Sequence, residues 1–136
     1  MSAPFITLAE YFGPFDHTDE HISKAEILLA RVNRLVEHLA TKKMVHFQIN
    51  PKTKSLISGE TQGGFRPQDS AQGAPSSSHK EARGIDLYDP EGEIDDSITD
   101  PMLEEFGLYR EHPAATRSWC HLTTRPPRSG KRSFYP

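Results

Sequence analysis

A histidine and an aspartate seven residues apart are the residues of this sequence best suited to binding a metal ion. His79 precedes Asp86, and the small residues Ala82 and Gly84 lie between them, so the chain can turn tightly and bring imidazole and carboxylate together. The strand pattern of residues 84–88 places Asp86 on the face away from the core. Such a pair can bind a metal ion, and the alternative is an ordinary hydrogen bond between the two side chains at the surface.

The cysteine content restricts the kind of site that is possible. Cys120 is the single cysteine, which excludes an internal disulfide and any metal site with several cysteines, so a metal would be held by histidine and carboxylate. Residues 119–123 predict a strand on which Cys120 and His121 point to opposite faces. Cys120 is therefore expected to be a small buried apolar residue and not a nucleophile paired with His121. Four other histidines are expected to be solvated: His17, His21, His38 and His46.

Length and composition exclude several classes of protein. The chain has 136 residues, 35% hydrophobic and 26% charged, with a formal net charge of −3. No basic surplus is available for a nucleic-acid or anionic-membrane binder, and no apolar run approaches the ~20 residues of a membrane span. The N-terminus shows no signal peptide, so we expect a protein made in the cytoplasm, with no nucleic-acid or membrane partner. Residues 66–78 have a linker composition, but the flanking segments are too small to fold alone, which predicts a single domain over 1–136.

Hydrophobic periodicity predicts the elements that position these residues. Apolar residues recur every three or four positions over 18–40 and predict one long amphipathic helix, and shorter helices are expected over 8–12 and 100–107. Strands are predicted over 45–49, 55–58, 84–88 and 119–123. The sequence thus predicts an α+β fold in which the long helix covers a small antiparallel sheet.

The segment that contains His79 and Asp86 resembles a known signature. The run from Ser77 to Asp86, SSHKEARGID, is similar to Ser-x-His-x-x-Gly-x-Ala-x-Asp of the zinc D-Ala-D-Ala carboxypeptidase and L-alanyl-D-glutamate endopeptidase family, which includes vancomycin-resistance dipeptidases and phage endolysins. Ser77, His79 and Asp86 match this signature, whereas Ala82 and Gly84 exchange its two small residues.

Three further segments extend the resemblance. Gly64-Phe65-Arg66 resembles the family's Ser-Gly-Tyr-Arg element, and Gly73-Ala74 resembles its Gly-Gly-Ala stretch. Trp119-Cys120-His121, with Arg125 after it, resembles the closing Trp-x-His strand that supplies the last zinc ligand. The order Arg, His, Asp, His is the order of the family.

The resemblance implies a Hedgehog/DD-peptidase-like fold with one Zn²⁺ held by His79, Asp86 and His121, and a fourth position open to water. It implies hydrolysis of a D-Ala-D-Ala or L-Ala-D-Glu type bond in peptidoglycan stem peptides, with a zinc-activated water as nucleophile. Arg66 would bind a substrate carboxylate or a carbonyl oxygen. The similarity to small phage-type members implies release by lysis or carriage in a phage particle, with phage structural proteins as partners.

One departure concerns the catalytic base. The family has a glutamate three residues before the last histidine, and this chain has Ser118 there, which has no useful basicity near neutral pH. Glu111 and His112 precede the final strand and are the nearest groups that could replace it, while Glu81 and Asp89 flank the first ligand pair. The alternative is a structural or binding protein, such as a virion component, that keeps the peptidase fold without turnover.

Overall fold

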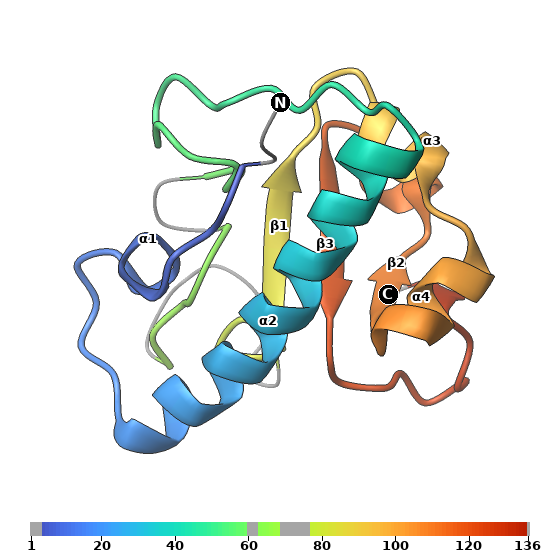
Figure 1. Ribbon diagram of the computed structural model, residues 1–136. Coiled ribbons are helices and arrows are strands. Elements are labelled where there is room, and N and C mark those ends of the chain that lie inside the picture. The colour runs from blue at the N-terminus through green and yellow to red at the C-terminus, as the bar shows by residue number, and fades with distance from the viewer. Residues whose placement is uncertain (1–3, 60–62, 69–76, 136) are drawn as a thin grey trace.

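The computed structural model describes residues 4–59, 63–68 and 77–135 and has an α+β architecture. The small sheet has the strand order β1-β3-β2-β4, and the longest helix, α2, crosses one face of β1 and β3 (Figure 1). The helices are α1 (Leu8–Phe12), α2 (Asp19–Lys42), α3 (Glu93–Ser97) and α4 (Asp100–Phe106). The strands are β1 (Gly84–Tyr88), β2 (Tyr109–Glu111), β3 (Trp119–Thr123) and β4 (Ser133–Phe134).

The sheet is mixed, which corrects the prediction of an antiparallel one. β3 pairs antiparallel with β1 and with β2, but β4 pairs parallel with β2. The chain leaves β3 through the loop at 124–132 and returns on the far side of β2, so β4 runs in the same direction as β2. A strand of two residues has no periodicity that a sequence pattern could detect.

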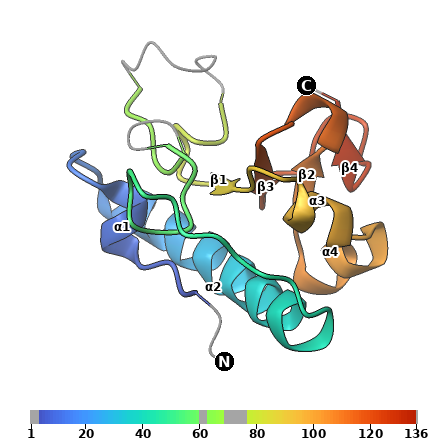
Figure 2. The same cartoon turned by 90° about the horizontal axis from the view of Figure 1, so that it is seen from above.

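Helix α2 follows from the apolar stripe seen in the sequence. Thr18 caps its N-terminus, and the side chain of His21 accepts a hydrogen bond from the Thr18 backbone in return. The apolar stripe is buried against the sheet, and Figure 2 shows the helix lying along one side of the row of strands. Its buried residues are Ala25, Leu28, Leu29, Val32, Leu35, Val36 and Leu39.

The two central strands each have one face in the core and one face away from it. Ile85 and Leu87 on β1 and Cys120 and Leu122 on β3 are fully buried in the hydrophobic core with α2. Burial of Cys120 is the predicted outcome. Since side chains alternate along a strand, Asp86 and His121 lie on the face opposite to α2. The strand predictions over 84–88 and 119–123 are confirmed.

The predicted strand over 45–49 is wrong. The backbone N–H of Val45 donates to the carbonyl of Leu39 at the end of α2, and that of His46 donates to the Glu93 side chain. These two N–H groups have hydrogen-bond partners outside any strand. The alternation of apolar and polar side chains was therefore not sufficient to make this segment pair with a strand. The segment 55–58 forms no named strand either, although Ile57 makes an isolated bridge to Leu87 at the edge of β1.

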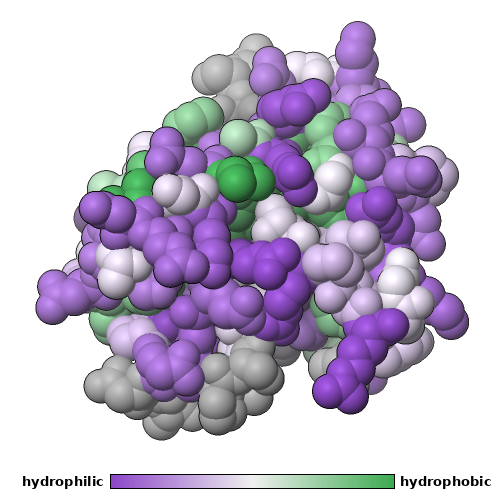
Figure 3. All heavy atoms as spheres, turned by 90° about the horizontal axis from the view of Figure 1, so that it is seen from below, coloured by the Kyte–Doolittle hydropathy of each residue, from purple (hydrophilic) through white to green (hydrophobic). Residues whose placement is uncertain are grey.

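One face of the molecule is largely polar. Figure 3 shows a face on which hydrophilic residues cover most of the surface and hydrophobic residues are exposed only in small patches. Within the described residues, no helix has both the length and the apolar character needed to cross a membrane.

The packing of α2 predicts a large difference between two of its apolar residues. Leu35 is fully buried, whereas Ile27 is 52% exposed on the same helix. Leu35→Ala is expected to lower the free energy of unfolding by about 2–5 kcal/mol, because it removes buried methyl groups and leaves a cavity. Ile27→Ala is the matched control, with an expected change within about 0.5 kcal/mol. Urea unfolding followed by circular dichroism measures both, and equal effects would contradict this packing.

Candidate metal centre

Asp86 and His121 meet because β1 and β3 pair in a fixed register. The two residues are direct partners across the antiparallel pair, so their side chains leave the sheet side by side. The Oδ1 atom of Asp86 lies 2.8 Å from Nδ1 of His121. The strand register therefore creates the first half of the site.

His79 reaches the same point from a turn that precedes β1. The backbone N–H of Ala82 donates to the His79 carbonyl and that of Arg83 donates to the Ser78 carbonyl, which closes the turn. The Nδ1 atom of His79 lies 2.8 Å from the carbonyl oxygen of Gly64. A carbonyl oxygen only accepts, so Nδ1 carries the proton and Nε2 faces Asp86 Oδ1 at 3.3 Å.

Of the two exchanged small residues of the signature, the structure explains the glycine at position 84 but not the alanine at position 82. Ala82 has a φ of 58°, in the left-handed region that favours glycine. At Gly84, an added Cβ would lie 2.3 Å from the Ser78 hydroxyl oxygen and 3.2 Å from the His121 ring. Gly84 therefore lets the turn pack directly against the His121 side chain, which places His79 beside it.

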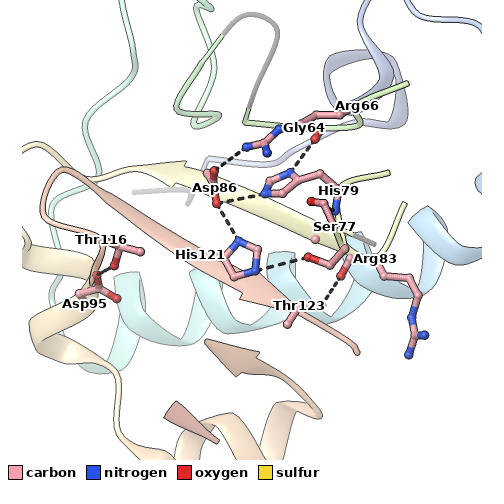
Figure 4. Close-up of polar contacts among 12 residues, drawn as sticks. Gly64, Arg66, Ser77, His79, Arg83, Asp86, Asp95, Thr116, His121 and Thr123 are labelled. Carbon is pink, nitrogen blue, oxygen red and sulfur yellow. Dashed lines mark hydrogen bonds and ion pairs between the residues drawn. The ribbon is translucent and has the colours of Figure 1, made fainter. Parts of the chain in front are cut away.

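The three side chains form a compact and buried set of donor atoms. One donor atom from each of His79, Asp86 and His121 lies within 4.8 Å of the others, and their exposed fractions are 3%, 9% and 5%. Figure 4 shows the imidazoles of His79 and His121 and the Arg66 guanidinium pointing toward the Asp86 carboxylate. Two imidazole nitrogens and one carboxylate oxygen are a donor set that can hold a metal ion.

The side chains that contact Asp86 keep it ionised. Burial alone would raise the pKa of Asp86, but its interactions with His79 and His121 outweigh burial and hold the pKa below its usual range. The Arg66 guanidinium lies 3.3 Å from Oδ2 of the same carboxylate. A carboxylate that stays ionised is ready to bind a cation throughout the neutral range.

Arg66 is held beside the ligand set by its own backbone. The Arg66 N–H donates to the carbonyl of His79, and the N–H of Phe65 donates to the carbonyl of Tyr11 in α1. The Arg66 side chain is largely buried and lines the same pocket as the three candidate ligands. The structure therefore places Arg66, the residue that the resemblance implies in substrate binding, beside His79 and Asp86.

The pocket that His79, Asp86 and His121 line has a volume of about 490 Å³. Arg66 lines one wall, and Glu111, Trp119 and Phe134 line the part formed by β2, β3 and β4. The contribution of Phe134 was missed by sequence reasoning, because β4 is too short to give a pattern and its place beside β2 depends on the tertiary fold.

The two candidates for the catalytic base, Glu111 and His112, differ in their position relative to the pocket. Glu111 lines the pocket. His112 stacks on the Tyr135 ring, and its Nδ1 accepts a hydrogen bond from the Ala114 N–H. Its side chain is not part of the described pocket lining. Ser118 is exposed and is likewise absent from that lining.

The remaining acidic candidates have structural partners. Glu81 is paired with Arg125 and lies 3.8 Å from the Arg83 guanidinium. Both carboxylate oxygens of Asp89 accept backbone N–H groups at the start of α3, from residues 94 and 95.

The segment Gly73-Ala74, which resembles the family's Gly-Gly-Ala stretch, lies outside the described residues. Comparisons with protein-family models, curated proteins and solved structures found no match to this chain.

The site predicts stabilisation by a divalent metal ion. Zn²⁺, Co²⁺ or Ni²⁺, added in turn, is expected to raise the Tm, because an ion bound only by the folded state stabilises it by about 2.7 kcal/mol at one hundred times its Kd. His121→Ala should abolish the rise, and the exposed His46→Ala should retain it. Differential scanning calorimetry measures the shift. A wild-type Tm that responds to none of the three ions would rule out the site.

Proposed function

We propose that the protein is a zinc-dependent peptidase that acts on peptidoglycan stem peptides. The observation that carries this proposal is the buried His79-Asp86-His121 set at the base of a pocket that also contains Arg66. The resemblance of residues 77–86 to the zinc carboxypeptidase and endopeptidase signature supports the reaction class. The Hedgehog/DD-peptidase-like fold is part of the same proposal.

The donor set suits zinc. Two donor atoms on one tetrahedral Zn²⁺, each at about 2.0–2.1 Å, lie about 3.3 Å apart. The 3.3 Å from His79 Nε2 to Asp86 Oδ1 matches this spacing. The 2.8 Å from His121 Nδ1 to the same oxygen is a hydrogen-bond distance, so these two atoms would separate by about 0.5 Å on binding zinc. Zn²⁺ bound there would polarise a peptide carbonyl and lower the pKa of a water molecule. Three protein ligands are typical of catalytic zinc sites, whereas structural sites have four.

Arg66 supplies the recognition of substrate in this proposal. A guanidinium presents planar N–H donors that match a carboxylate or a carbonyl oxygen of a peptide. The hydrogen bond from the Arg66 backbone N–H to the His79 carbonyl holds Arg66 close to the candidate ligands. A bound peptide would therefore have its scissile bond positioned relative to the metal by contacts from the loop at residues 64–66.

A second candidate is a binding or structural protein that retains the peptidase fold. The observation that favours it is Ser118, which stands where the resembled family has its glutamate and is exposed. Such a protein would bind zinc and a stem peptide without turnover, for example as a component of a phage particle.

Zinc-loaded protein is expected to cleave purified peptidoglycan stem peptides and to lose that activity in a chelator. Arg66→Lys should raise KM about 10- to 100-fold, because one ammonium group does not replace a bidentate guanidinium. Arg34→Lys on α2 is the matched control and should leave KM unchanged. Mass spectrometry of the released peptides identifies the bond that is cut.

The same assay distinguishes the two candidates. Zinc binding and peptide binding without any cleavage would support the binding protein and contradict the peptidase. Cleavage that is unaffected by chelation would contradict the role of the metal.

A further inference from the structure

The pairing of β2 with β3 brings a carboxylate toward the ligand set. Tyr109 pairs with Thr123 and Arg110 pairs with Leu122. Continuing this antiparallel register by one residue places Glu111 opposite His121. Paired residues project from the same face of a sheet, so Glu111 projects from the face that carries His121 and, on β1, its partner Asp86.

The pocket lining agrees with this register. Glu111 lines the same pocket as the three ligands, Arg66 and Trp119. Among the described residues of that lining, Asp86 and Glu111 are the only carboxylates. Asp86 belongs to the ligand set, so Glu111 is the acid of the described lining that is left for proton transfer.

The backbone on either side of Glu111 is fixed from both directions. The Arg110 N–H donates to the Arg132 carbonyl at 2.8 Å, and the His112 N–H donates to the Phe134 carbonyl at 2.6 Å. The Arg110 side chain points to the opposite face, where Nη1 donates to the Asp95 carbonyl at 2.7 Å. β2 thus lies between β3 and β4 in the sheet, with Arg110 bound to α3 on one face and Glu111 extending toward the pocket on the other.

We infer that Glu111 is the general base of the peptidase, in the role that the resembled family gives to a glutamate at the position of Ser118. This inference rests on the proposed function. The base has moved from the segment before β3 to the neighbouring strand β2, which reaches the ligand set from the side of His121. Ser118 is exposed and outside the described lining, so the position of the family's base is not used in this fold.

The proton transfers balance in one hydrolytic cycle. A water molecule attacks the peptide carbonyl carbon through an oxygen lone pair, and the Glu111 carboxylate takes one of its protons as the new C–O bond forms. The C–N bond then breaks, and Glu111 gives that proton to the nitrogen of the leaving amine. The products are a free amine and a carboxylic acid, which releases its proton to solvent at neutral pH. Water is the sole co-reactant consumed.

The test compares Glu111→Gln with the wild type and with Glu105→Gln, an exposed residue of α4 that serves as the matched control. Glutamine keeps the shape of the side chain but cannot accept the proton, so kcat should fall by about 10²–10⁴-fold with little change in KM. Zinc affinity, measured by competition with a chromophoric chelator, should stay within about threefold because Glu111 is not a ligand. Glu105→Gln should match the wild type in both measurements.

Chemical rescue separates a base from a packing residue. In Glu111→Ala, added formate should restore part of kcat, because a small carboxylate can enter the space left by the side chain and accept the proton. Formate should not change the activity of Glu105→Gln.

The outcomes separate this inference from the function on which it rests. If Glu111→Gln cleaves stem peptides within a few-fold of the wild-type rate, the inference is overturned and the peptidase proposal stands. A loss of zinc affinity of tenfold or more would make Glu111 a ligand and also overturn it. Failure of formate to restore any of the activity lost in Glu111→Ala would assign Glu111 a packing role. If wild-type protein with one bound zinc cleaves no stem peptide, both the proposed function and this inference are wrong.

Discussion

The register between β1 and β3 is the constraint on which the candidate metal centre depends. Because side chains alternate, a slip of one residue on β1 would turn Asp86 into the core and expose Ile85 and Leu87. Leu122 and the other buried residues of β3 oppose such a slip in the same way, through their contacts with α2. Burial of one face of the sheet thus holds Asp86 and His121 side by side on the other.

Burying Asp86 is costly unless opposite charges or hydrogen-bond donors surround it. His79, His121 and Arg66 supply them, from the turn before β1, from β3 and from the loop after residue 63. Arg66 and His121 are distant from Asp86 in the sequence, so the carboxylate links separate parts of the fold. Removing one of these three side chains leaves the negative charge of the buried Asp86 carboxylate less well compensated. Such a change is typically more destabilising than the loss of a surface ion pair.

Helix α1 connects the site to the rest of the molecule. The hydroxyl of Tyr11 donates to the carbonyl of Gly84 at the start of β1, at 2.8 Å, and burial raises the pKa of this phenol far above its usual range. The carbonyl of Tyr11 accepts the N–H of Phe65, next to the residue that bears the guanidinium. One buried tyrosine therefore fixes both β1 and the loop that carries Arg66. The structure thus makes the geometry of the pocket dependent on a residue that does not line it.

The sequence by itself determined the features that depend on local spacing, which are the amphipathic stripe of α2 and the inward and outward faces of β1 and β3. The resemblance to a known signature added His79, Asp86 and His121 as candidate metal ligands. Each of these follows from a period of 3.6 or 2 residues or from a short motif. The tertiary structure alone decided the parallel addition of β4, the lack of a strand over 45–49, and the entry of Glu111 into the pocket while His112 stacks on Tyr135. The physical reason is that strand pairing joins the backbone groups of segments that are far apart in the sequence. The alternation of side chains within one segment does not identify the strand with which that segment pairs.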